Sequence, residues 1–219
     1  MKTLIYWGGW DGHTPKETTE ILANGLRDGG AAVDVVDRPD VLLDKDALAG
    51  YDLVVPFWTM SAPEAITHDH VKNLSDAVRA GTGIGGVHGG MGDSVRHSLP
   101  YQWMTGGQFL DHPHVGPYTV ELTEAGKKPS ITRDLPASFP YESEQYYMLV
   151  DPRIDALATT VYDWEGRKVT MPVVWQAMWG KGKVFYSALG HVAAEFTKYP
   201  EVLAMTIRGL RWAARGHSA

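Results

Sequence analysis

The sequence has no cysteine among its 219 residues. This absence excludes disulfide bonds, metal sites built on thiolates and catalysis by a cysteine nucleophile. Long apolar runs are absent as well. The run at residues 4–7 is too short for the apolar part of a signal peptide, and no run reaches the roughly 20 residues of a membrane helix. We therefore expect a soluble cytoplasmic protein that does not bind membranes.

The sequence also has no excess of basic residues. Its 20 lysines and arginines are scattered and outnumbered by 26 aspartates and glutamates, which gives a formal net charge of −6. Because nucleic-acid-binding proteins usually carry a basic patch, we expect no nucleic-acid partner. The length suits one large domain and no repeat or linker divides the chain, so we predict a single domain over residues 1–219.

The first part of the chain alternates between strand and helix patterns. Residues 4–7 are typical of a buried strand, and the composition around Thr14 predicts a helix start, with Thr14 as N-cap and Glu17 completing a capping box. Further strands are predicted at 33–36, 52–56 and 83–87, and a second long helix at 63–80. This order predicts a doubly wound, flavodoxin-like α/β fold with a mostly parallel sheet and helices on both faces.

The second half of the chain has a mixed pattern. Residues 101–114 show no clear period, and a long irregular segment in a compact domain is typically a functional loop or lid. The remaining predicted elements are strands at 118–122, 156–164, 172–179 and 184–188, a hairpin connection at 163–167, and a closing helix at 200–215. We interpret these strands as antiparallel additions to the sheet.

One short glycine-rich segment reads Gly85-Gly86-Val87-His88-Gly89-Gly90. Its glycines allow a tight turn after a strand, which is how nucleophile elbows present one side chain above the carboxyl edge of a sheet. The side chain presented here is that of His88. Imidazole acts as a metal ligand, a general base or an orienting donor rather than as a lasting nucleophile, so the segment indicates chemistry unlike that of serine or cysteine hydrolases.

Other histidines also follow predicted strands, at the sheet edge where open α/β proteins bind ligands. Four histidines are candidate ligands of a divalent metal, with zinc favoured by their chemistry: His13, His88, His112 and His191. In the metal-free alternative, His88, His191 and Glu144 are the catalytic acid/base residues. Glu144, like His13 and His112, is either a metal ligand or an acid/base partner. Glu144 could equally begin a helix, where its charge would favour the helix dipole.

Aromatic side chains in glycine-rich loops are candidates for binding a sugar, because carbohydrate rings commonly stack on aromatic faces. Trp10, Tyr101 and Trp103 are the candidate pocket walls, and Gly89 and Gly90 would allow a ligand to approach the backbone beside His88. Most of the other large aromatic side chains are expected in the core.

Several short motifs follow one another in a specific order. They are the glycine-rich loop ending at His13, the turn around His88, the segment 106–113, Glu144-Gln145-Tyr146-Tyr147, the segment 172–186, Leu189-Gly190-His191 and the helix 207–214. In this order the chain resembles, over nearly its whole length, the ThuA-like family of trehalose utilisation, which has the class I glutamine amidotransferase-like fold. The amidotransferase relatives carry a cysteine at the elbow, so the resemblance implies their architecture without glutaminase activity.

The resemblance implies a role in carbohydrate metabolism, with trehalose, a related disaccharide or a keto-sugar as the small-molecule partner. Our leading hypothesis is a sugar-processing hydrolase, lyase or isomerase with a histidine-rich cleft. The first alternative is a non-catalytic sugar-binding or protein-interaction module on the same fold. The second alternative is a homodimeric scaffold whose histidines are structural.

Overall fold

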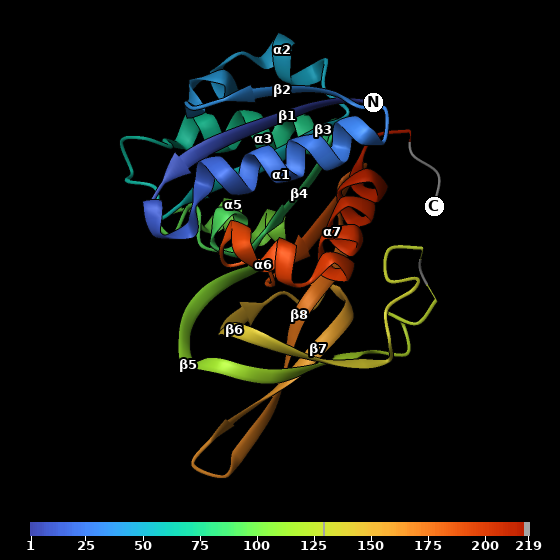
Figure 1. Ribbon diagram of the computed structural model, residues 1–219. Helices are drawn as coiled ribbons and strands as arrows, with labels where there is room; N and C mark the ends of the chain where they lie inside the picture. The colour runs from blue at the N-terminus through green and yellow to red at the C-terminus, as the bar shows by residue number, and fades with distance from the viewer. Residues whose placement is uncertain (129, 217–219) are drawn as a thin grey trace.

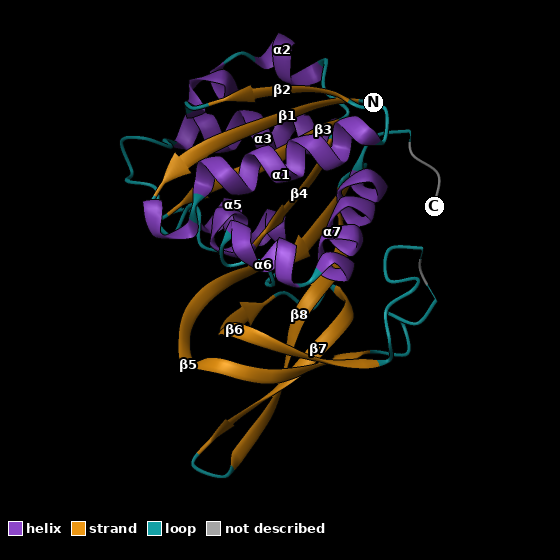
Figure 2. Ribbon diagram, in the orientation of Figure 1, coloured by secondary structure: helices purple, strands orange, loops and turns teal. Residues whose placement is uncertain are grey.

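The computed structural model describes residues 1–128 and 130–216, while residues 129 and 217–219 of the predicted domain range lie outside the described residues. In the described part, nine strands form one sheet in the order β2-β1-β3-β4-β9-β8-β7-β5-β6. Helices pack on the strands β2, β1, β3, β4 and β9, and β5 to β8 extend away from the helices (Figures 1 and 2). The protein therefore has an α/β fold with an extended all-strand part.

The strands at the start of the sheet order are parallel to one another. They are β2 (Ala32–Val36), β1 (Lys2–Gly9), β3 (Leu53–Thr59), β4 (Gly83–Val87) and β9 (Gly182–Ser187). Every residue of β4 and nearly every residue of β3 is buried, as expected for strands with helices on both faces. The strands predicted at these positions are confirmed to within a few residues.

Helices cover both faces of these parallel strands. On one face α1 (Pro15–Asp28) contacts α7 (Pro200–Ala213), and on the other α3 (His68–Ala80) contacts α5 (Leu99–Thr105) (Figure 1). The short helices are η1 (Asp11–His13), η2 (Pro39–Leu43), α2 (Lys45–Ala49), α4 (His88–Gly92) and α6 (Ala193–Lys198). None of the helices among the described residues is both long enough and apolar enough to span a membrane.

One helix start and one predicted capping interaction differ from the sequence prediction. Helix α3 begins at His68 rather than at residue 63, because Thr67 and His70 form a capping box there. Thr14 is the N-cap residue of α1, but its side chain makes no capping bond. Its hydroxyl instead accepts a 2.9 Å hydrogen bond from the backbone N–H of Ala193, so it ties the start of α1 to α6.

The other half of the sheet is antiparallel. It contains β8 (Arg167–Trp179), β7 (Asp155–Trp164), β5 (Gly107–Leu122) and β6 (Ser138–Val150). Within the described residues four strand pairings are parallel and four antiparallel, so the prediction of a mostly parallel sheet overstated the parallel part.

The prediction of an irregular segment at 101–114 was wrong. Its first residues belong to α5 and the rest to β5, which is 16 residues long. Prolines and glycines inside β5 hide the strand period, and the register with β6 shifts twice between Phe109 and His114. β6 was not predicted at all, and Glu144 lies in this strand rather than at a helix start.

Candidate active site

The turn between β4 and α4 presents His88 at the carboxyl end of β4. Val87 is extended, whereas His88 has a φ of 43°, in the left-handed region that a residue other than glycine rarely adopts. The flanking glycines permit close packing. A Cβ on Gly86 would lie 2.6 Å from the Cβ of Met91, and one on Gly89 would lie 2.2 Å from Cε1 of His13. The turn thus has the strained geometry of an elbow, and Gly89 brings α4 against His13.

Three histidines from separate segments meet at this turn. The ring centroids of His13, His88 and His191 are 4.9 to 5.0 Å apart in every pair. His13 ends η1, which follows β1, and His191 follows β9. Because β1, β4 and β9 are parallel, their carboxyl ends lie at the same edge of the sheet, and this brings the three rings together.

Glu144 reaches the same place from β6. Its Oε1 lies 3.5 Å from Nε2 of both His112 and His191, and its Oε2 lies 3.6 Å from Nε2 of His88. β6 is the last strand in the sheet order, yet the strong curvature of β5 carries it back towards the parallel strands (Figure 1). One carboxylate therefore faces the Nε2 atoms of three histidines.

The Nδ1 atoms of the two most buried histidines have partners of their own. Nδ1 of His13 lies 2.8 Å from the hydroxyl of Thr59, and Nδ1 of His88 lies 2.9 Å from the hydroxyl of Tyr146. Both rings are thereby fixed with Nε2 left for another partner, which is the usual arrangement around protein metal ions.

Glu195 lies behind His191, on the side of the ring that carries Nδ1. Its carboxylate accepts hydrogen bonds from the hydroxyls of Tyr141 (2.6 Å) and Ser143 (2.7 Å) and from the backbone N–H of His191 (3.0 Å). Its Oε1 also lies 4.0 Å from Nδ1 of His191. Three hydrogen bonds hold this nearly buried carboxylate in place, so it is positioned to orient the His191 ring.

Sequence reasoning missed Tyr146 and Glu195. A signal existed for both, since Tyr146 follows Glu144 by two residues, which places both on one face of a strand, and Glu195 follows His191 by four. The signal for Tyr146 was not usable before β6 was known to be a strand.

Burial keeps the two innermost rings uncharged. The pKa of His13 falls from 6.5 to about 4. Burial is the main cause, and the neighbouring His191 and His112 add smaller contributions. Burial also lowers the pKa of His88 well below its usual value, with His13, His191 and His112 adding to the effect. A neutral imidazole has a free lone pair, the form that accepts a proton or ligates a metal.

Two ring nitrogens of the site, Nε2 of His88 and Nε2 of His191, are among the buried atoms of the described residues that have no hydrogen-bond partner. A buried polar atom without a partner is costly and in native proteins usually marks a site for an ion, water or ligand. Both atoms face the Glu144 carboxylate, so these two unmet groups lie where the histidines converge.

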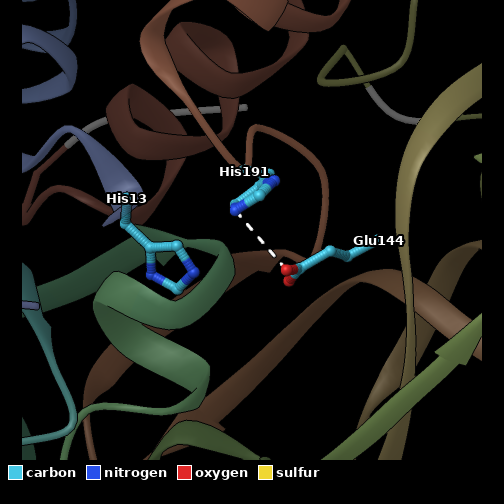
Figure 3. Close-up of side chains that lie close together, drawn as sticks. All are labelled: His13, Glu144 and His191. Carbon is cyan, nitrogen blue, oxygen red and sulfur yellow. Dashed lines mark ion pairs between the residues drawn. The ribbon is translucent and has the colours of Figure 1, made fainter. Parts of the chain in front are cut away.

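His13, Glu144 and His191 could hold a metal ion (Figure 3). Each offers one ligand atom, and these atoms all lie within 4.8 Å of one another. Donors about 2.05 Å from a tetrahedral zinc are about 3.3 Å apart, and Glu144 Oε1 and His191 Nε2 are already at 3.5 Å. The sequence prediction named His13, His88, His112 and His191 as ligands and Glu144 as a ligand or an acid/base residue. The closest group contains His13, Glu144 and His191, with His88 and His112 beside it.

Trp10 is the one predicted aromatic wall that lies at the histidines. Its ring contacts that of His13 edge-on at 4.9 Å, and the residue is 47% exposed. Gly90 packs α4 against β3, because a Cβ there would lie 2.6 Å from the ring of Phe57. Gly90 is therefore a packing position in this structure rather than an open backbone surface.

Tyr101 and Trp103 require correction as pocket walls of this site. Tyr101 is 2% exposed and belongs to the core, so its ring offers no free face to a ligand. Trp103 is exposed, but it stacks near Arg153 and lines a pocket with Leu149 and Val150 that contains none of the histidines. The sequence predicted a loop here that would bring both rings to the histidines. Residues 99–105 instead form helix α5, which places Tyr101 in the core and Trp103 in the other pocket.

Acid should destabilise the protein through His13. Its pKa is about 4 in the folded chain against 6.5 in an unfolded one, so below about pH 6.5 the unfolded chain binds a proton that the folded chain does not accept. The loss of stability is absent above about pH 7, grows as pH falls and is complete near pH 4. At about pH 5 it amounts to about 2 kcal/mol. Urea unfolding with a chelator present, at about pH 7.5 and pH 5, would measure it.

His13→Asn should show a pH-dependent loss smaller by this amount. His114→Asn, at an exposed position of β5, is the matched control and should behave like the wild type. Equal losses in the wild type and His13→Asn would contradict the neutral state assigned to His13.

The fold and the site together define an α/β protein with a histidine at a strand-to-helix elbow and a histidine and glutamate centre at the carboxyl edge of its parallel strands. The ThuA family model, described as trehalose utilisation, matches residues 2–213. The chain belongs to the ThuA family, which confirms the resemblance seen in its motifs. No curated protein matches the chain.

Solved structures share the fold. A ThuA-like protein from Bacteroides uniformis is 19% identical with a TM-score of 0.76, covering 97% of this chain and 91% of its own. Cytoplasmic Protein STM1381 from Salmonella typhimurium LT2 is 16% identical with a TM-score of 0.74, covering 98% and 100%. A beta-galactosidase from Bacillus circulans sp. alkalophilus is 14% identical with a TM-score of 0.57, covering 95% of this chain but 30% of its own. At these identities the likeness establishes the fold alone.

Proposed function

We propose that this ThuA-family protein is a carbohydrate-processing enzyme that acts on trehalose, a related disaccharide or its keto derivative. The observation that carries the proposal is the convergence of His13, His88, His191 and Glu144 from four separate segments. Buried polar groups with shifted pKa values gather at functional sites more often than elsewhere. The substrate class follows from the family. Without a thiol the reaction is a hydrolysis, elimination or isomerisation rather than a glutaminase reaction.

The residues suited to hold a divalent metal, zinc in the first instance, are His13, Glu144 and His191. Two imidazoles and one carboxylate are a common ligand set for zinc and for other borderline divalent ions. A bound ion would polarise a sugar carbonyl or hydroxyl or make a bound water more acidic. Thr59 supports this assignment because its hydroxyl lies 2.8 Å from Nδ1 of His13. Glu195 supports it because its carboxylate binds the backbone N–H of His191 and lies 4.0 Å from Nδ1 of that ring.

His88 is the proposed proton acceptor. Burial keeps its ring neutral, Tyr146 holds Nδ1, and Nε2 faces the site 3.6 Å from the Glu144 carboxylate. A neutral, oriented imidazole of this kind can take a proton from a sugar hydroxyl, from a carbon next to a carbonyl or from water. The strained backbone at His88 supports a functional reason for its position.

The sugar is proposed to approach from the side of His112 and Trp10. His13 and His88 are almost fully buried, whereas the side chain of His112 is 39% exposed and Trp10 is 47% exposed. The indole of Trp10 touches His13, so a pyranose stacked on its face would lie next to the centre.

We also propose that the parallel strands and their helices form a doubly wound core. The strand order β2-β1-β3-β4-β9 with helices on both faces supports a doubly wound, flavodoxin-like core of the class I glutamine amidotransferase type, in one domain over residues 1–219. The name of the Salmonella relative supports a cytoplasmic location.

Metal analysis and a turnover assay on one preparation test this proposal. Protein purified without chelator should contain close to one equivalent of zinc or another divalent ion. When it is incubated with trehalose, maltose and their 3-keto forms and followed by NMR, one of these sugars should be converted to product. Conversion with less than about a tenth of an equivalent of metal would end the metal assignment. Saturable shifts without product would replace the enzyme by a sugar-binding module.

A further inference from the structure

A second concave surface lies on the opposite face of the strands that carry the site. His112 and Tyr146 point to the histidine centre, whereas their chain neighbours Asp111 and Tyr147 face the other way and are paired across β5 and β6. Successive residues of a strand point to opposite faces, so one layer of sheet separates the two surfaces. The volume of this groove is about 650 Å³.

Aromatic side chains form the groove floor and one rim. Tyr147 and Tyr162 contact each other edge to face, with ring centroids 5.4 Å apart. Trp164 stands at the rim and is 55% exposed. Leu110 (56% exposed) and Val169 (38% exposed) line the same groove, so the indole belongs to an exposed apolar surface of a kind that commonly marks an interaction site.

The rim is held in place by the β7–β8 hairpin. Trp164 pairs with Arg167 across the turn, and Glu165 and Gly166 have the positive φ values, 51° and 82°, of a tight two-residue connection. Asp163 accepts a 2.9 Å hydrogen bond from the N–H of Gly166. The exposed indole is therefore presented by a well-defined turn.

Charged groups surround the aromatic floor. Asp111, Arg167 and Lys168 line the groove together with the aromatic residues. An exposed aromatic face flanked by hydrogen-bond acceptors and donors matches a pyranose ring, whose C–H face is apolar and whose hydroxyls both donate and accept. The volume suits a ligand of one or two sugar rings.

We propose that the groove between Asp111, Tyr147, Trp164 and Arg167 is a second carbohydrate-binding site, with a pyranose ring stacked on Trp164. It is separate from the histidine centre and does not require that centre to be catalytic. Asp111 and Tyr147 adjoin His112 and Tyr146 along the chain, so a sugar bound here would also contact the strands that position the centre.

NMR of the tryptophan indole N–H groups tests this proposal, with maltose as the probe. The signal missing from the Trp164→Ala spectrum identifies Trp164, and in the wild type it should shift saturably with maltose. Arg167→Gln, which keeps the indole, should weaken that shift about tenfold in apparent affinity. Sorbitol, which has hydroxyls but no ring, should leave the signal in place. Trp103→Ala, at an exposed tryptophan outside the groove, should leave the titration unchanged.

Three results would overturn the proposal. The Trp164 signal could stay fixed while maltose saturates other signals, or it could move equally with sorbitol. It could also move with protein concentration instead of maltose, in which case a second copy of the chain covers the groove.

Discussion

Replacement of His88 by asparagine should reduce turnover of the converted sugar by about 100-fold to 10,000-fold, the usual contribution of a positioned proton-transfer group. Asparagine accepts positive φ better than most residues, so the elbow at φ 43° should be retained. Its side chain can still bond to Tyr146 but cannot accept a proton at the Nε2 position. The loss should therefore appear in kcat, with KM changed much less.

Two further variants sharpen this test. Tyr146→Phe removes the hydroxyl 2.9 Å from His88 Nδ1 and should lower kcat by a smaller factor while shifting the pH profile, because the ring loses the partner that fixes its tautomer. His114→Asn, on the exposed part of β5, should match the wild type. Full turnover by His88→Asn would remove His88 from the chemistry and leave its strained backbone without explanation.

Substitution of Glu144 by glutamine should weaken zinc binding by more than about 100-fold, since even outer partners of metal ligands contribute 10-fold to 100-fold. The change keeps the size of the side chain but removes the negative charge that lies within 3.6 Å of the Nε2 atoms of His88, His112 and His191. A chelator competition measured at neutral pH would give the affinity.

Glu142→Gln is the matched control, because Glu142 lies on the same strand but is exposed and paired with Lys198 at 2.7 Å. It should bind zinc like the wild type. Unchanged affinity in Glu144→Gln would show that Glu144 is not a ligand and would leave it the acid/base role that the sequence also allowed.

Much of the parallel half of the fold could be predicted because its signals are local. Strands β1, β3 and β4 are short apolar runs bounded by turns, and α1 and α7 have apolar stripes of helical period. The antiparallel half carries weaker signals. In β5, Pro113, Gly116 and Pro117 interrupt the pattern, and the strand is stabilised by pairing with a distant partner that no local window contains.

The site residues also fall into two groups, those predictable from local signals and those placed by long-range packing. The placement of His13, His88 and His191 at strand ends followed from the order of the elements, because parallel strands end at one edge. Glu144 was named from its sequence motif, but its meeting with the histidines, and the part of Tyr146, depend on how far β5 curves to return β6 to that edge. Tyr101 and Trp103 were misassigned for the related reason that residues 99–105 fold as a helix.

The sequence by itself determined that there is no thiol chemistry, that a histidine occupies a glycine-walled elbow and that further histidines follow other strands. These are properties of residue type and local backbone freedom. Only the tertiary structure decided which groups meet: it placed Glu144 between three histidines, Tyr146 and Thr59 behind two of them, and Trp164 over a groove on the reverse face. The reason is that these contacts depend on sheet curvature and register, which are set by long-range packing rather than by any short segment.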